Sequence, residues 1–270
     1  MGVGCLCQRP DGRRYRLLAR AARRCSGTPA ARSPHPRQTV ACRRHRLRAG
    51  CRSACALHTM ADREGATLFM VLLAGLGLLC GSGSDSGRLA FSVPTAGRHR
   101  REQERQIGYF VNPLVLEVDL SGNPAFTQLV SRVRTDALAA QQHSTAPLHP
   151  LRRELAAHCE RIRLGFNLLN APMPTRTLGE VVLEPVSRGS AMIHLPPGME
   201  PGEPGRVEIG LVMIEEEGRL HGAWMHDPSA VDPEQFASLV GEWESLLRRI
   251  VQDPGRRLTD FAKRQAVEVL

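Results

Sequence analysis

The stretch that most constrains the fold is residues 66–80, which read ATLFMVLLAGLGLLC and carry no charge. A run of this composition must be buried, either in a protein core or in a membrane. It is shorter than the roughly 20 residues that a membrane-spanning helix needs, so we interpret it as a buried core helix. A signal peptide beginning at Met60 is the alternative. Its first residues would be acidic, however, and Leu79 stands where a small residue is expected.

Charge and cysteine divide the chain into two parts. The formal net charge is +9, but residues 1–60 hold fourteen arginines and a single acid, Asp11, so the remainder is mildly acidic. Six of the eight cysteines also lie in the first sixty residues, and only Cys80 and Cys159 follow. The body of the chain therefore has no disulfide framework, which favours a reducing, cytoplasmic location.

Residues 1–56 mix Arg, Ala, Pro, Cys and His without helical or strand periodicity, so we predict a disordered segment. A nucleic-acid-binding arm is disfavoured because only Tyr15 is available for base stacking, and the cysteine spacing is poor for zinc. A reading frame shifted within a GC-rich gene is a further hypothesis for this composition. We place a globular body at 57–258 and a tail at 259–270. No nucleic-acid partner, membrane or metal is expected.

The body alternates strands and helices irregularly, which predicts an α/β fold with a mixed sheet and packed helices. Asn123 and Asp232 are expected as N-caps, with Pro124 and Pro233 in the first helical positions. A further short helix is expected at 151–159. Strands are expected at 89–93, 109–119, 162–169, 178–186, 191–195, 207–214 and 220–226, the last two forming a hairpin.

The segment Gly108-Tyr109-Phe110-Val111-Asn112 resembles the Gly-x-Phe-Val-Asn motif of condensation domains from non-ribosomal peptide synthetases. The resemblance covers about residues 57–258. Further segments are similar to the family in the same order, namely 65–74, 93–98, 119–126, 166–170 and 250–254. The chain thus resembles the C-terminal half of such a domain. By this resemblance Gly108, Phe110, Asn112 and Arg98 are the site residues, lining a substrate tunnel or supporting the structure.

The resemblance implies one of two chloramphenicol-acetyltransferase-like lobes, between which an amine attacks a thioester to form a peptide bond. The substrates would arrive on the phosphopantetheine of carrier proteins, and no cofactor would bind directly. Carrier proteins, other synthetase modules and a missing N-terminal lobe are the implied partners. The reactive motif, His-His-x-x-x-Asp-Gly, belongs to that other lobe, and this sequence has no two adjacent histidines. We therefore assign no catalytic residue.

The lobe also departs from the family after the helix that follows Asn123. Residues 142–148 lack the two acids of the family's His-Gln-Asp-x-Pro-Phe-Glu, and the next Arg-Asp motif is not recognisable at 155–165. His143 and His226 are conceivable replacement bases, but neither has a nucleophile or carboxylate at a recognisable spacing. Two hypotheses remain open: a truncated domain that is inactive alone, or a non-catalytic half-domain that docks a carrier protein or a separately encoded lobe. In the plainest interpretation, Gly108 to Asn112 is simply a buried strand.

Overall fold

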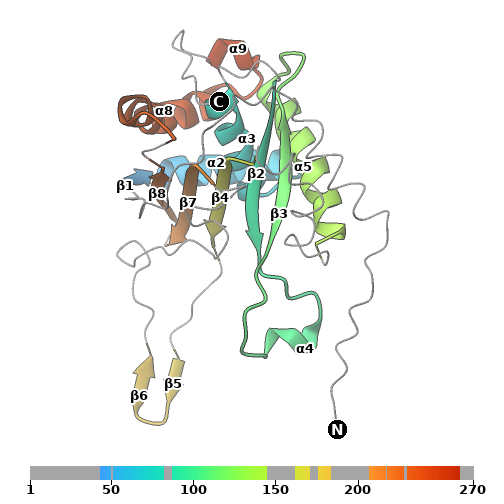
Figure 1. Cartoon of the computed structure of the whole chain (residues 1–270), viewed down its shortest axis with the longest axis vertical. Coiled ribbons are helices and arrows are strands. Elements are labelled where there is room, and N and C mark those ends of the chain that lie inside the picture. The colour runs from blue at the N-terminus through green and yellow to red at the C-terminus, as the bar shows by residue number, and fades with distance from the viewer. Residues whose placement is uncertain are drawn as a thin grey trace.

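The centre of the molecule is a six-stranded mixed sheet with the strand order β1-β8-β7-β4-β2-β3 (Figure 1). The computed structural model describes residues 43–49, 51–81, 87–144, 162–170, 176–183, 207–216, 218–227 and 230–261. The strands are β1 (Arg43–Ala49), β2 (Arg88–Thr95), β3 (Asn112–Asp119), β4 (Leu164–Leu169), β7 (Ile209–Glu216) and β8 (Arg219–His226). A separate hairpin of β5 (Arg176–Leu178) and β6 (Val181–Leu183) projects beyond the sheet. The predicted α/β class is confirmed.

The sheet is parallel in its middle and antiparallel toward both edges. Strand β4 pairs in parallel with β2 and β7, whereas β2–β3, β7–β8 and β8–β1 are antiparallel. The β7–β8 pair is the predicted hairpin, with Glu216 opposite Arg219. Successive residues of a strand point to opposite faces, so the burial of β7 throughout Ile209–Ile214 means that both faces of the sheet are covered there.

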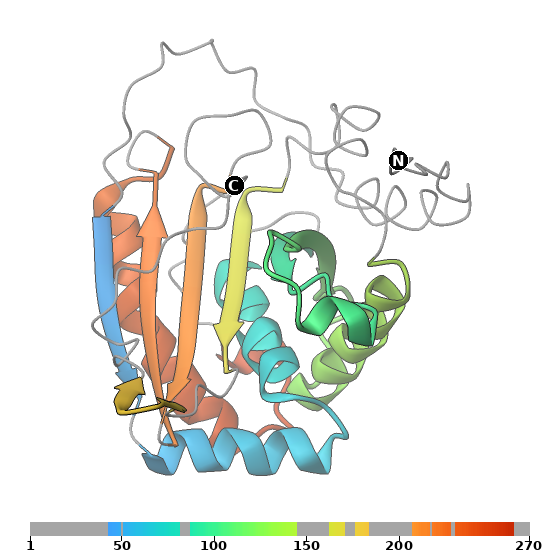
Figure 2. The same ribbon diagram turned by 90° about the horizontal axis from the view of Figure 1, so that it is seen from below.

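The helices form a layer against the sheet. Figure 2 shows α2 (Cys51–Arg63), α3 (Leu68–Cys80) and α8 (Pro233–Gln252) on one side of it, while α5 (Phe126–Gln142) packs along β3. Helix α3 begins after Thr67, whose hydroxyl accepts from the Met70 N–H at 3.3 Å, and almost all of it is buried. Helix α8 begins as predicted, because Asp232 accepts from the backbone N–H groups of Glu234 and Gln235.

Close packing of α3 against β3 explains one of its two glycines, Gly77. A Cβ at Gly77 would lie 2.4 Å from a methyl of Val118, so only glycine lets the helix approach β3 this closely. On the other side of the core, Trp224 of β8 meets Trp243 and Phe236 of α8 edge to face, at centroid distances of 6.1 and 6.2 Å. These apolar contacts join both ends of the sheet to one helical layer.

The N-terminal boundary of the body lies earlier than residue 57. Residues 43–49 form β1, which pairs with β8 from Arg43 opposite His226 to Ala49 opposite Leu220. Helix α2 then begins at Cys51 and ends at Arg63, so the charged residues before the apolar run close α2 and do not open α3. Of the segment predicted to be disordered, residues 1–42 lie outside the described residues.

Several element ends also need correction. Strand β3 begins at Asn112 rather than 109, and the strand predicted at 178–186 is instead the β5–β6 hairpin, up to residue 183. Helix α5 begins at Phe126. Asn123 does not cap α5, because the side-chain oxygen of Asn123 accepts instead from the Thr259 N–H at 3.0 Å. Thr259 belongs to the short helix α9 (Leu258–Phe261), which lies mostly within the segment predicted to be a tail. The expected helix at 151–159 and strand at 191–195 lie outside the described residues.

Ion pairs join β2 to β3 at one end of this strand pair. The Arg88 guanidinium contacts Glu117 at 2.7 Å and Asp119 at 3.0 Å. Burial alone would raise the pKa of Asp119, but hydrogen bonds from the Ser121 hydroxyl and N–H, with the charges of Arg88 and Arg132, together lower that pKa below its ordinary value. The carboxylate is therefore stabilised in its charged form at the turn into α5.

In the described part of the chain, no single helix is long and apolar enough to cross a membrane. Only the pair Ser53–Arg63 and Leu68–Cys80 reaches that length together, and the two are bent by 102°.

Candidate functional site

The predicted site residues meet in the loop that connects β2 to β3, residues 96–111, here called the β2–β3 loop. The Arg98 guanidinium lies over the Phe110 ring, 4.4 Å from its centroid, which is a cation–π contact. It also donates to the carbonyl oxygens of Gln103 and Gln106, the latter at 3.0 Å. Arg98 thus holds the two ends of the loop together around the short helix α4 (Arg101–Glu104).

Gly97 allows the loop to close. Its φ is +64°, a left-handed conformation that favours glycine, and a Cβ there would lie 1.7 Å from the Phe110 carbonyl oxygen. No other residue type can occupy this position without moving the backbone that follows Gly108. Gly108 itself has a weaker constraint, because a Cβ there would lie 3.1 Å from an edge atom of the Phe110 ring.

Asn112 connects the loop to the end of α5. Its side-chain amide donates to the Ser144 carbonyl oxygen at 2.7 Å, while its own carbonyl accepts from the Thr95 hydroxyl at 2.7 Å. Ser144 is buried, and its hydroxyl donates to the Gln141 carbonyl at 2.6 Å. The same hydroxyl oxygen lies 3.5 Å from Nδ1 of His99. Asn112 therefore bonds to both Thr95 and Ser144, accepting from the Thr95 hydroxyl through its main-chain carbonyl and donating to the Ser144 main-chain carbonyl through its side-chain amide.

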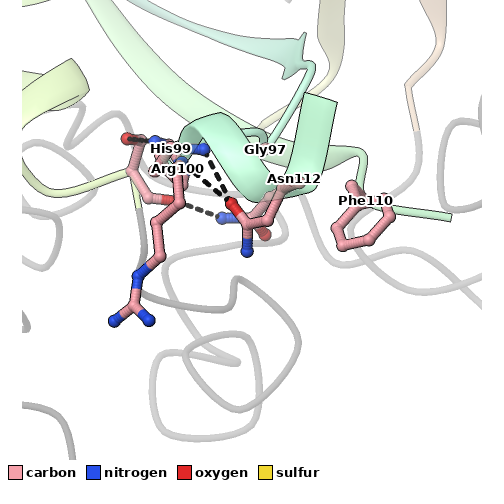
Figure 3. Close-up of a pocket in the computed structure, with 7 residues that line it drawn as sticks. Gly97, His99, Arg100, Phe110 and Asn112 are labelled. Carbon is pink, nitrogen blue, oxygen red and sulfur yellow. Dashed lines mark hydrogen bonds between the residues drawn. The ribbon is translucent and has the colours of Figure 1, made fainter. Parts of the chain in front are cut away.

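These contacts surround an open pocket of about 420 Å³ (Figure 3). Gly97, His99, Arg100, Gln103, Phe110, Asn112 and Ser144 line it. The side-chain oxygen of Gln103 accepts from the backbone N–H groups of His99 and Arg100, each at 3.0 Å. Figure 3 shows the Arg100 side chain extending away from the ribbon, with no dashed line at its guanidinium.

The structure therefore brings Arg98, Phe110 and Asn112 together around one pocket, with Gly108 beside the Phe110 ring. It corrects the interpretation of this segment as a buried strand, because residues 107–111 precede β3 and the Tyr109 side chain is 64% exposed. Ile107 is fully exposed.

Neither of the two histidines considered as replacement bases is among the residues that line the pocket. His226 is buried at the end of β8 and stacks on Phe236 with ring centroids 3.9 Å apart. His143 caps the end of α5 but does not line the pocket. His99, Gln103 and Ser144 were not identified from the sequence. Among the residues that the structure describes, no cluster of three or more His, Cys, Asp or Glu side chains could hold a metal ion.

Comparisons with known proteins agree with the motif. A model of the condensation domain family matches residues 19–171, more than half of the chain and including part of the arginine-rich segment. A linear gramicidin synthase protein of Brevibacillus parabrevis is 31% identical over 209 residues, which cover 76% of this chain and 3% of that protein. The chain therefore spans only a small part of this curated relative. The frame-shift hypothesis stays a prediction.

Solved structures show the same fold. A four-domain nonribosomal peptide synthetase bound to AMP and glycine is similar with a TM-score of 0.72 at 18% identity, covering 95% of this chain and 21% of that one. The first condensation domain of the calcium-dependent antibiotic synthetase has a TM-score of 0.66 at 18% identity, covering 92% of this chain and 53% of that one. The similarity thus extends over about half of that solved chain.

Proposed function

The chain belongs to the condensation domain family, and from that premise we propose that it is the C-terminal lobe of a domain that forms peptide bonds between carrier-bound thioesters. We further propose that it has no activity alone. The observation that carries this proposal is the half-length match to a condensation domain structure, together with the lack of two adjacent histidines in the sequence. General base catalysis requires a positioned base within hydrogen-bond reach of the amine, and His-His-x-x-x-Asp-Gly would have to come from a second lobe.

In this proposal the lobe supplies shape rather than chemistry. The side chains that line the pocket in the described part of the chain include no acid. The hydroxyl of Ser144 donates to the Gln141 carbonyl, so it is not an activated nucleophile. The expected partners are carrier proteins that present phosphopantetheine-bound substrates, with no cofactor bound directly. A cytoplasmic location is part of the same proposal and rests on the cysteine distribution.

The test is reconstitution. We would join or mix this chain with an N-terminal lobe that carries His-His-x-x-x-Asp-Gly, supply two loaded carrier proteins, and measure the amide product by mass spectrometry. The donor domain with its own C-terminal lobe is the positive control. We expect product only with both lobes, and a fall of roughly 10² or more when the second histidine is replaced by alanine. Product from this chain alone, above uncatalysed aminolysis, would contradict the proposal.

A second candidate, a non-catalytic docking half-domain, is favoured by the β5–β6 hairpin. This hairpin extends from the sheet with Leu178, Val181 and Val182 between 55 and 65% exposed (Figure 1). Clustered apolar side chains on a projecting element mark an interaction site. The experiment measures binding of an isolated N-terminal lobe by sedimentation. Changing the three residues to serine should weaken binding, whereas Leu138→Ser on α5, also an exposed leucine, should not.

A further inference from the structure

We propose that the pocket beside the β2–β3 loop binds a small organic oxyanion, a carboxylate or a phosphate ester, through Arg100 and Gln103. Neither residue belongs to the Gly-x-Phe-Val-Asn motif, and the proposal does not depend on lobe pairing or peptide-bond formation. It rests on the orientation of one amide, the position of one guanidinium and the charge of the pocket wall.

The orientation of the Gln103 amide is fixed by its own backbone contacts. Its oxygen accepts from the N–H groups of His99 and Arg100, so the amide cannot be turned over without placing two donors against two donors. The NH₂ group must therefore point away from the loop backbone. Gln103 lines the pocket, and no described residue accepts from this NH₂ group. Two N–H donors are thus held ready for an acceptor from solution.

Arg100 supplies the charge. Its guanidinium forms no ion pair with any side chain in the described part of the chain. In Figure 3 no dashed line joins it to the other residues drawn. This differs from Arg98, whose guanidinium is occupied by the Phe110 ring and two carbonyls. A guanidinium presents several parallel donors that match the two oxygens of a carboxylate or phosphate.

The surroundings favour an anion over a cation. Among the described residues, no carboxylate lines the pocket, and the polar lining consists of amides, a hydroxyl, an imidazole and Arg100. The β2–β3 loop as a whole holds four arginines and two glutamates, Glu102 and Glu104, which gives it a net positive charge. Neither glutamate is among the pocket-lining residues. An approaching oxyanion therefore meets positive potential and no opposing charge at the wall.

The size of the pocket indicates an organic ligand rather than a bare ion. About 420 Å³ is more than ten times the roughly 30 Å³ that one water molecule occupies in the liquid. Phe110 contributes an apolar part of the lining beside the polar groups of the other residues. A ligand with a charged head and a short apolar or hydroxylated portion would use both.

The experiment titrates the whole chain with two probes, butyrate for a carboxylate and glycerol phosphate for a phosphate ester, and follows the Gln103 side-chain amide signals by NMR. Comparing the two probes distinguishes the two sources of the anion. Gln103→Glu is the informative variant, because a glutamate can still accept from both backbone N–H groups while it replaces the NH₂ donors with a negative oxygen. Arg100→Gln removes the charge of the one arginine among the described pocket-lining residues. Arg101→Gln is its control, since it makes the same change in net charge outside the lining.

We expect saturable binding of at least one probe, about tenfold or more weaker in Arg100→Gln and lost in Gln103→Glu. Arg101→Gln should bind within about twofold of the unaltered chain at physiological salt, because the charge is screened. The proposal is overturned if neither probe binds at tens of millimolar, if Arg101→Gln weakens binding as much as Arg100→Gln, or if Gln103→Glu binds normally. Circular dichroism of each variant checks that the fold is retained.

Discussion

Gly97→Ala tests whether the β2–β3 loop is held as tightly as its contacts indicate. The left-handed φ of +64° costs an L-residue about 1–2 kcal/mol, of which the less flexible unfolded chain returns about 0.4–1 kcal/mol. The new Cβ would also stand 1.7 Å from the Phe110 carbonyl oxygen, a backbone atom that cannot rotate away. The loop must open by more than about 1 Å to restore ordinary contact. Opening separates Arg98 from the Phe110 ring and from its carbonyl acceptors.

The lost contacts determine how much the free energy of unfolding of Gly97→Ala should fall. A partly exposed cation–π contact contributes about 0.5–1 kcal/mol and a charged hydrogen bond about 1.5 kcal/mol or more, so the free energy of unfolding should fall by about 2–4 kcal/mol. Gly122→Ala is the matched control, since Gly122 has a φ of +79° and a Cβ there would meet nothing within 4 Å, and it should lose about 1 kcal/mol or less. Urea unfolding can be followed by fluorescence, because both tryptophans are buried. Equal losses in the two variants, within about 0.5 kcal/mol, would refute the reasoning.

Three further outcomes follow from local contacts. Asp232→Ala removes two hydrogen bonds at the start of α8 and should lower the free energy of unfolding by about 1 kcal/mol, measured in urea. Burial raises the pKa of Cys80 to about 12, so iodoacetamide should label exposed Cys55 in the folded chain and Cys80 only after unfolding, as peptide mapping would show. Because folding lowers the pKa of Asp119, its charge stabilises the fold at neutral pH. Asp119→Asn should therefore be less stable at pH 7, and the difference should vanish as the pH falls from about 4 through the folded pKa.

Elements with strong local signals could be predicted from the sequence. Helix α8 is an example, because Asp232 and Pro233 mark its start and its apolar residues recur at helical spacing. The β7–β8 hairpin is another, since two apolar runs flank a turn at Gly218, which has a positive φ. Each of these signals lies within the element that it predicts.

Strand β1 and helix α2 were not predicted from the sequence, for two different reasons. Strand β1 is an edge strand held by hydrogen bonds to β8, whose paired residues lie between 171 and 183 positions further along the chain. Its arginine-rich sequence has no apolar alternation that could reveal it. Helix α2 did carry a helical period, with Ala54, Leu57 and Ala61 buried on one face. The change in composition at residue 57 places the predicted start of the globular body inside this helix, and so hides the period. The helix itself continues across that position.

The sequence identifies some residues around the pocket and misses others, again because some of the contacts join residues that are far apart along the chain. Arg98 and Phe110 could be named because they lie within one recognisable stretch of sequence. Ser144 could not, because its carbonyl reaches Asn112 only when the end of α5 folds back beside β3. Gln103 lies in a polar segment without periodicity, and its part in the loop depends on two backbone N–H groups that only the three-dimensional structure places.

The contacts of Gly97, Arg98 and the residues of the Gly-x-Phe-Val-Asn motif also indicate what this part of the chain does. Arg98 is occupied by an aromatic ring and two carbonyls, and the Asn112 amide donates to the Ser144 carbonyl, while Gly97 and Gly108 leave room for Phe110. A group whose donors are already satisfied within the chain has little left to offer a ligand. These residues therefore shape the pocket, and in our proposal Arg100 and Gln103, which also line it, determine what it binds. Changing Arg98 should therefore disturb stability and binding together, whereas changing Arg100 should disturb binding alone.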